Sequence, residues 1–217
     1  MTAGMTRDST VGYGCEAEIV DEVGLDGGKV LVCKGVYPPA EDTWLLLNAA
    51  VGYANRLRPR LVIDVGSGTG AVYIGVGLSR VVYGVLIDVS PCAAVCSLLN
   101  VKRLNLLADV VQCDNASCIR VPRGSLVVYN TPYLPSSDEM PESLWWQGGA
   151  REAVKLVRLL RGYCGWLGLV TIANTSPASE LLDVARSSGI EARIVAEKPE
   201  DFFTRVYVVE LRPRQCA

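Results

Sequence analysis

The densest group of residues that could do chemistry is the segment from Asp64 to Gly70, which reads D-V-G-S-G-T-G. It continues the run Leu61–Val65, whose short, apolar and β-branched composition predicts a strand covered on both faces. Gly66, Gly68 and Gly70 would let the backbone turn sharply and let a ligand lie against it. Because ligands of open α/β sheets bind beyond the carboxyl ends of the strands, this turn is a candidate ligand site. A tight turn without a ligand is the alternative.

The spacing of the glycines indicates which ligand this would be. Dinucleotide sites carry G-x-G-x-x-G, whereas this turn has G-x-G-x-G with Asp64 two residues before the first glycine. The D-x-G-x-G-x-G form resembles the first motif of class I methyltransferases, which bind S-adenosyl-L-methionine. That cofactor carries no phosphate, only a carboxylate, an ammonium, a ribose and an adenine. The resemblance implies that Asp64 orients the turn and helps to receive the methionine ammonium.

Two further acids follow the next two predicted strands. Asp88 ends the run Val81–Ile87, where its carboxylate can accept hydrogen bonds from both ribose hydroxyls. NAD enzymes share that feature, and a helix N-cap ahead of Ser90 is the alternative. Asp114 follows the run Asp109–Gln112 and can accept from the adenine amino group, as an acid does at this point in many class I methyltransferases. A plain turn acid is the alternative for Asp114.

A second candidate site follows the predicted strand Leu126–Tyr129, which ends in Asn130, Thr131, Pro132 and Tyr133. This segment resembles the N-P-P-Y signature of methyltransferases that act on planar amide or amino nitrogens. Such nitrogens are poor nucleophiles because their lone pair is delocalised. Asn130 Oδ1 and the carbonyl of residue 131 would accept their N–H hydrogens and aim the nitrogen at the methyl group. Tyr133 would pack against the flat acceptor group and exclude water; a polar turn is the alternative.

Thr131 stands where the signature has proline. The carbonyl acceptor survives this change because every residue has one, but the fixed φ of proline is lost. We therefore expect activity with slightly looser geometry. The chain has no histidine, which excludes mechanisms that need an imidazole base. In-line methyl displacement needs none.

The rest of the chain supplies the elements that would position these residues. Short apolar runs alternate with helical stretches, which predicts right-handed crossovers and a mostly parallel sheet. The predicted class is an open, Rossmann-like α/β sheet of seven mostly parallel strands, with an antiparallel edge strand and helices on both faces. Beyond the strands named above, the expected strands are Gly168–Ile172, Ile190–Ala196 and Val206–Leu211, with β-like runs at Cys15–Val20 and Lys29–Gly35. The expected helices are Trp44 to about Asn55, Ala71–Ser79, Pro91–Val101, Arg151–Leu160 and Ala178–Ser187.

Length and composition predict the number of domains, the location of the protein and the kinds of partner it binds. The 217 residues, half of them hydrophobic, fit one domain over residues 15–217 after a disordered segment 1–14. The net charge of −2 and the lack of a Lys/Arg run do not favour direct binding of nucleic acid. No signal peptide or membrane-spanning run is found, which predicts a cytoplasmic protein. The eight cysteines form no C-x-x-C pair, so we expect no metal site. In the cytoplasm most thiols would be reduced, and disulfides are the alternative if the source is a hyperthermophile.

Two further segments make the resemblance more specific. Val36–Leu46, which contains P-P-A-E-D-T, and Trp146–Gly149, which reads W-Q-G-G, flank the glycine turn and the N-T-P-Y segment. The four recur in this order in the HemK group, the release-factor glutamine N5-methyltransferases, here in the short form of archaea and eukaryotes. The resemblance implies that the methyl acceptor is the glutamine of a Gly-Gly-Gln motif in a translation release factor. It also implies that Thr43 lies near the cofactor and that residues 135–149 border the substrate channel.

The same resemblance implies a small zinc-binding activator protein that adds a strand to the sheet edge. Three other functions stay open at this point. The first is a methyltransferase acting on adenine N6 or other amino groups of nucleic acid, which would need a basic groove and a target-recognition domain. The second is a methyltransferase of arginine or lysine side chains or of a small molecule. The third is a scaffold that has kept the fold and lost activity.

Overall fold

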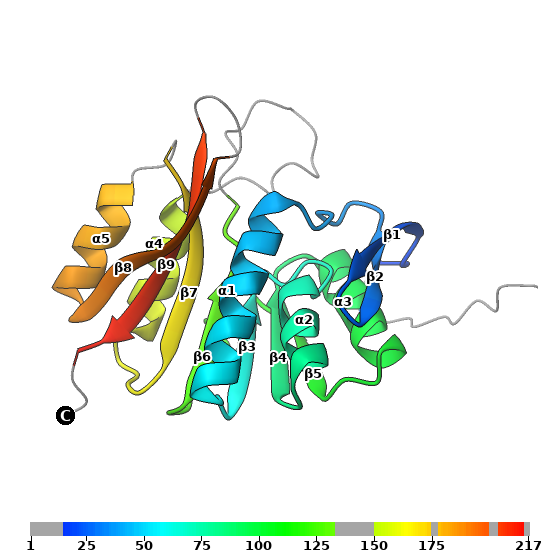
Figure 1. The fold of residues 1–217 in the computed structure, drawn as a ribbon, viewed down its shortest axis with the longest axis horizontal. Coiled ribbons are helices and arrows are strands. Elements are labelled where there is room, and N and C mark those ends of the chain that lie inside the picture. The colour runs from blue at the N-terminus through cyan, green and yellow to red at the C-terminus, as the bar shows by residue number, and fades with distance from the viewer. Residues whose placement is uncertain (1–14, 133–149, 175–177, 200–203, 215–217) are drawn as a thin grey trace, which may run out of the picture.

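A computed structural model describes residues 15–132, 150–174, 178–199 and 204–214 of the chain (Figure 1). A seven-stranded sheet runs through it in the order β5-β4-β3-β6-β7-β9-β8. β9 is antiparallel to both of its neighbours, whereas β3 to β7 pair in parallel. The strands are β3 (Leu61–Val65), β4 (Tyr83–Asp88), β5 (Ala108–Gln112), β6 (Ser125–Tyr129), β7 (Leu167–Ala173), β8 (Ile190–Pro199) and β9 (Arg205–Pro213).

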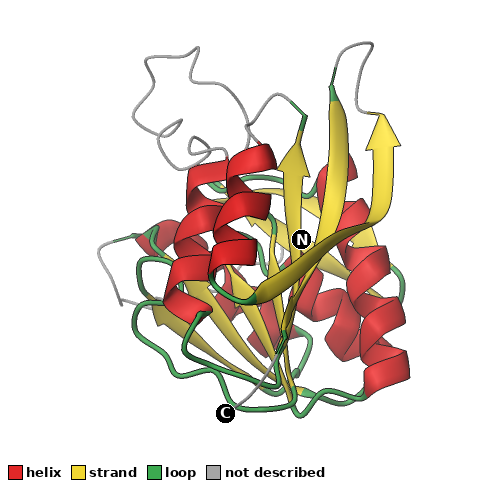
Figure 2. Ribbon diagram, turned by 90° about the vertical axis from the view of Figure 1, so that its left-hand side faces the viewer, coloured by secondary structure: helices red, strands yellow, loops and turns green. Residues whose placement is uncertain are grey.

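Helices cover both faces of this sheet (Figure 2). Alternate residues of a strand face opposite sides, so Val62 packs in the core under α1 and α2 while Ile63 packs in the core under α4 and α5. The predicted class I Rossmann-like fold is thereby confirmed. The helices are α1 (Glu41–Leu57), α2 (Ala71–Ser79), α3 (Pro91–Arg103), α4 (Ala150–Leu160) and α5 (Ala178–Ser187).

A separate hairpin precedes the sheet in the sequence. β1 (Ile19–Leu25) and β2 (Gly28–Cys33) pair antiparallel, with Leu25 opposite Gly28. The first of these strands lies several residues further along the chain than the predicted run Cys15–Val20, and it includes Gly24. Buried Asn100 of α3 ties the hairpin down: it accepts from Leu31 N at 2.7 Å and donates to Leu31 O at 2.9 Å.

Strand register brings the candidate site residues to one end of the sheet. Val65, at the end of β3, lies opposite Ile87 of β4 and Tyr129 of β6. The next residue in each strand is therefore Gly66, Asp88 or Asn130. Local pattern predicted these strand ends, since each buried run stops at a glycine or a polar residue.

Three disulfides connect the described cysteines: Cys15–Cys92, Cys33–Cys96 and Cys113–Cys118, with Cys164 free. The expectation that most thiols are reduced is therefore wrong for this part of the chain. Two of the pairs join residues 77 and 63 positions apart, which no local pattern reveals. No described helix is both long and apolar enough to cross a membrane.

Candidate functional site

A cavity of about 1070 Å³, counted with its open mouth, lies beyond the carboxyl ends of β3, β4 and β6. Most of the residues that the sequence singled out line it. They are Thr43, Asp64, Gly66, Gly68, Asp88, Asp114, Asn130, Thr131 and Pro132. Tyr133 and the W-Q-G-G segment, by contrast, fall outside the described residues.

The glycine turn has the backbone that its sequence predicts. Gly66, Gly68 and Gly70 all have positive φ, at 61°, 54° and 81°. A Cβ at Gly66 would lie 2.7 Å from the ring of Tyr129, so the turn closes tightly over β6. Gly70 was predicted to bind the cofactor, but it is not among the lining residues. A Cβ there would lie 2.9 Å from Leu86, so Gly70 allows α2 to pack closely on the sheet.

Asp64 is buried below the turn, with 2% of its surface exposed. Its Oδ2 accepts a hydrogen bond from Tyr73 N, in the first turn of α2, at 3.0 Å. Burial raises the pKa of Asp64 to about 8, because the Tyr73 bond offsets only part of the lost hydration and the Asp88 charge opposes ionisation further. A cation beside this carboxyl group would therefore favour its ionised form.

Asp88 connects the glycine turn to the helix that follows β4. One carboxylate oxygen accepts from Gly68 N at 2.8 Å and the other from Ser90 N at 2.9 Å. The N-cap of α3 is Ser90, whose hydroxyl accepts from Ala93 N, so capping is not the role of Asp88. Burial raises the pKa of Asp88 despite its backbone donors. Each oxygen retains a lone pair for a further donor.

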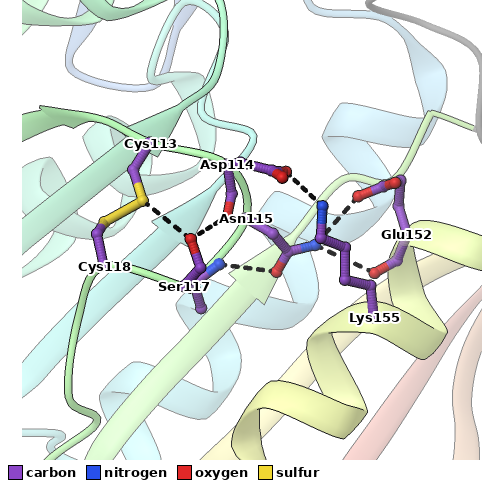
Figure 3. Close-up of polar contacts among 8 residues, drawn as sticks. Cys113, Asp114, Asn115, Ser117, Cys118, Glu152 and Lys155 are labelled. Carbon is purple, nitrogen blue, oxygen red and sulfur yellow. Dashed lines mark hydrogen bonds and ion pairs between the residues drawn. A yellow bond between two sulfur atoms is a disulfide. The ribbon is translucent and has the colours of Figure 1, made fainter.

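The turn after β5 forms another wall of the cavity (Figure 3). Asp114 accepts a hydrogen bond from Lys155 of α4 at 2.5 Å. Asn115, at a positive φ of 55°, donates to the backbone and side chain of Glu152, both at 3.2 Å. The Cys113–Cys118 disulfide closes this turn, and α4 holds it from the side. The side chain of Asp114 is 60% accessible.

The amide of Asn130 is fixed at both ends. Its Nδ2 donates to Asp42 Oδ2 at 2.9 Å and to Thr43 Oγ1 at 3.2 Å. Its Oδ1 accepts from Thr171 Oγ1 at 2.7 Å. Because a carboxylate only accepts, the bond to Asp42 requires the NH₂ group on that side and the carbonyl oxygen toward Thr171.

Three residues of the site were missed by sequence reasoning. Asp42 lies in the P-A-E-D-T segment and Thr171 lies in β7, 88 and 41 positions from Asn130. Ser67 lies in the glycine turn and lines the cavity, and its buried hydroxyl has no hydrogen-bond partner among the described residues. The signature residues around Asp42 and Ser67 were visible in the sequence. Thr171 carried no local signal, because only the pairing of β6 with β7 brings it near.

The charges around the cavity select the type of ligand. Five acids line it, and the described lining residues include no lysine or arginine. Such a wall attracts cations and opposes a pyrophosphate. S-adenosylmethionine, with a sulfonium and an ammonium against one carboxylate, fits this wall, whereas a dinucleotide does not. The acids are Asp42, Asp64, Asp88, Asp114 and Glu152.

Comparison with known sequences identifies relatives of the chain. No protein-family model matches it. The human methyltransferase HEMK2 is 30% identical over 173 residues, which cover 72% of this chain and 80% of the relative. A putative protein N5-glutamine methyltransferase of Methanocaldococcus jannaschii is 29% identical over 115 residues, so the match spans about half of each chain, 53% and 56%. The release factor glutamine methyltransferase of Clostridium acetobutylicum is 35% identical over 117 residues, 50% of this chain and 40% of the relative.

Solved structures share the fold at low identity. The E. cuniculi Mtq2–Trm112 complex aligns with a TM-score of 0.57 and 19% identity, over 82% of this chain and 98% of that one. A T. thermophilus 16S rRNA methyltransferase, solved with AdoMet and guanosine, aligns with a TM-score of 0.65 and 16% identity, over 89% and 50%. These structural likenesses support the fold. The human relative also supports membership of its family, because the 30% identity extends over most of both chains. The chain belongs to the HemK family of methyltransferases.

Proposed function

We propose that the chain transfers a methyl group from S-adenosylmethionine to the side-chain amide nitrogen of a glutamine in a Gly-Gly-Gln motif of a translation release factor. Support comes from the relatives, two of which are named for glutamine methylation. The Mtq2–Trm112 complex is described as responsible for methylation of the termination factor eRF1. Because release factors work with ribosomes, the proposal also assigns the chain to the cytoplasm.

The residues around the glycine turn fit the cofactor. Asp88 would accept from the ribose hydroxyls, Asp64 would receive the methionine ammonium, and Asp114 would accept from the adenine amino group. Ser67 lines the same cavity, and its hydroxyl, which has no partner among the described residues, would be available for a hydrogen bond to the cofactor. When bound, the cofactor supplies an electrophilic methyl group on its sulfonium sulfur.

The observation that carries the proposal is the fixed amide of Asn130 in the same cavity. A carbonyl oxygen has two lone pairs, so Oδ1 can accept from an acceptor amide while Thr171 occupies the other. The carbonyl of Thr131 would accept the second N–H. Two acceptors held in place raise the electron density on the substrate nitrogen and align it with the methyl group. Asp42 restrains the plane of the Asn130 amide without itself moving a proton.

The partner proposal concerns the outer strand β5. Exposed apolar side chains lie at the amino ends of β5 and of its neighbour β4: Val81 by 83%, Leu107 by 55% and Tyr83 by 43%. A strand edge flanked by apolar surface suits a protein that binds by strand addition. We propose that a small zinc-binding activator binds here, as Mtq2 is found in complex with Trm112. Leu107→Asp should abolish co-purification with such a partner while leaving cofactor affinity unchanged; retained co-purification would reject this edge.

The proposed activity is tested by transfer of labelled methyl from S-adenosylmethionine to a release factor, with and without the activator. The control is the same factor with the Gly-Gly-Gln glutamine changed to alanine. Label on the wild-type factor and none on the alanine control would support both substrate and site. Label on DNA or RNA instead would keep the acceptor site and reject the substrate. Cofactor binding without any label on these acceptors would reject the proposed reaction.

A further inference from the structure

Thr131 and Thr171 hold each other at the ends of β6 and β7. The two strands are parallel neighbours, with Tyr129 opposite Val170. Thr131 N donates to Thr171 Oγ1 at 2.9 Å, and the Thr131 hydroxyl donates to the carbonyl of Thr171. Both residues are buried, with exposures of 2% and 0%. The backbone at residue 131 is therefore restrained by two hydrogen bonds, which the expectation of looser geometry did not anticipate.

The same Thr171 hydroxyl reaches the amide of Asn130. It donates its one hydrogen to Asn130 Oδ1 at 2.7 Å while accepting from Thr131 N. A hydroxyl can do both, and a donor that itself accepts a hydrogen bond is strengthened by polarisation. The backbone of residue 131 and the side chain of residue 130 are thus linked through one oxygen atom.

We propose that Thr171 is a positioning residue which, together with Thr131, replaces the restraint that proline gives in the N-P-P-Y signature. Proline fixes φ through its ring but has no N–H, so it could not make the bond to Thr171 Oγ1. Thr131 gives up the ring and gains two hydrogen bonds, which hold the carbonyl that the acceptor amide would use. This inference rests on the proposed function, since Asn130 and that carbonyl are its two hydrogen-bond acceptors.

The hydrogen bonds at the two ends of Asn130 have different effects. Asp42 and Thr43 hold the NH₂ end of the Asn130 amide. Without a contact at the other end, the position of Oδ1 would be restrained only through this NH₂ group. The Thr171 hydroxyl fixes the second end and therefore the plane. An error of about 1 Å in such a group can cost about 100-fold in rate. Loss of Thr171 Oγ1 should therefore lower kcat more than it weakens the binding of the cofactor.

The first test compares Thr171→Val with Thr171→Ser. Valine keeps the shape and removes the hydroxyl, so kcat should fall about 10- to 100-fold while the Kd for S-adenosylmethionine stays within about threefold. Serine keeps the hydroxyl and should restore kcat to within about threefold of the wild type. The matched control is Ser125→Ala, at the other end of β6, whose hydroxyl donates only to Pro122 O at 2.8 Å. It should lower the melting temperature without changing kcat.

The second test places Thr171→Val in a Thr131→Pro background. Thr171→Val alone leaves the buried Thr131 N–H without an acceptor, which is costly. With proline at residue 131 there is no N–H to leave unpaired, so Thr171→Val should cause a smaller fold-loss in kcat there than in the wild type. Equal fold-losses in both backgrounds would overturn the inference, because they would mean that the two threonines act independently.

A readout without substrate separates this inference from the proposed function. The side-chain NH₂ signals of Asn130, assigned with Asn130→Ala, report the orientation of the amide in ¹⁵N-labelled protein. Thr171→Val should shift them, whereas Thr171→Ser and Ser125→Ala should leave them in place. If the wild type transfers no methyl to a release factor, the proposed function fails, but the Asn130 signals still test whether Thr171 positions the amide. Unchanged Asn130 signals in Thr171→Val, or a kcat equal to that of the wild type, would overturn the positioning role.

Discussion

Buried acids in two regions of the sheet have pKa values shifted in opposite directions. Asp64 is the second-last residue of β3 and Asp88 is the last residue of β4; burial raises the pKa of Asp64 to about 8 and also raises that of Asp88. Glu210 of β9 lies opposite Leu169, in the first half of β7 and away from the cavity. Burial would raise the pKa of Glu210 too, but hydrogen bonds from Arg193, Arg212 and Tyr53 lower it to about 2.

The difference separates a ligand site from a structural cluster. Glu210 has two guanidinium partners within the protein, so its charge is compensated whether or not a ligand is present. Among the described residues, Asp64 and Asp88 accept hydrogen bonds only from backbone N–H groups. A cationic ligand would compensate the charges of these two carboxylates. In the free protein, burial without a cation disfavours their ionised form. Perturbed carboxyl groups of this kind in a cleft are a mark of functional sites.

The largest expected effect is on catalysis at the cavity. Asn130→Ala removes one of the two proposed acceptors for the substrate amide. Methyl transfer should fall by at least about 100-fold, as for loss of a fixed polar group at a transition state. Cofactor affinity should stay within about threefold, because Asn130 serves the acceptor. Parallel loss of transfer and affinity would remove Asn130 from the catalytic role.

The next effect is on cofactor affinity. Asp88→Ala removes a charged acceptor and frees the N–H groups of Gly68 and Ser90. Hydrogen bonds to charged groups are worth about 1.5–3 kcal/mol, so calorimetry should find binding weaker by about 10- to 100-fold. An unchanged Kd would show that Asp88 does not hold the ribose.

At Glu210 the expected effect is on stability alone. Glu210→Ala should lower the free energy of unfolding by about 2 kcal/mol, because Tyr53, Arg193 and Arg212 lose their shared acceptor. The depressed pKa means that the stabilisation is present above the ordinary pKa of 4.5 and is lost as pH falls toward 2. Urea unfolding at several pH values should find this loss in the wild type and not in Glu210→Ala. A change in cofactor affinity would contradict the conclusion that the cluster around Glu210 is separate from the ligand site.

The smallest effect is expected at the turn after β5 that the Cys113–Cys118 disulfide closes. Cys118→Ser opens the Cys113–Cys118 disulfide and leaves the contacts of Asp114 and Asn115 with α4 in place. Cofactor affinity should therefore fall by only about threefold. Cys164→Ser, which changes a free cysteine, is the control and should bind as the wild type does. A larger loss would mean that the disulfide, and not α4, holds this wall.

Local pattern predicted the parts of the fold that local chemistry determines. The apolar run before the glycine turn, the helix Ala71–Ser79 that follows, and the polar end of β6 all lie where the sequence indicated. The predicted antiparallel edge is confirmed, because the outer strand β8 pairs antiparallel with β9. The pattern did not give the strand order, in which β7 and β8 flank β9. The pairing partners of β9 depend on how whole strands pack together, and the periodicity of the sequence does not encode this.

The site was predicted where a motif carries it and missed where tertiary contact builds it. Gly66, Gly68 and Asn130 belong to recognisable segments, and all three line the cavity. Thr171 reaches Asn130 only because β6 and β7 pair, and a threonine in a buried strand is otherwise unremarkable in sequence. The pairs Cys15–Cys92 and Cys33–Cys96 depend in the same way on tertiary contact, here between α3 and the N-terminal segment with its hairpin.

The most direct test of the account is a calorimetric titration of the wild-type protein with S-adenosylmethionine at pH 7, in two buffers of different ionisation enthalpy. If the acids of the cavity receive a cation, Asp64 should ionise on binding, since its pKa is about 8 in the free protein. Release of about 0.9 proton per bound cofactor is then expected at pH 7, and about none in Asp64→Asn. Binding without proton release, or tighter binding of NAD than of S-adenosylmethionine, would contradict the account.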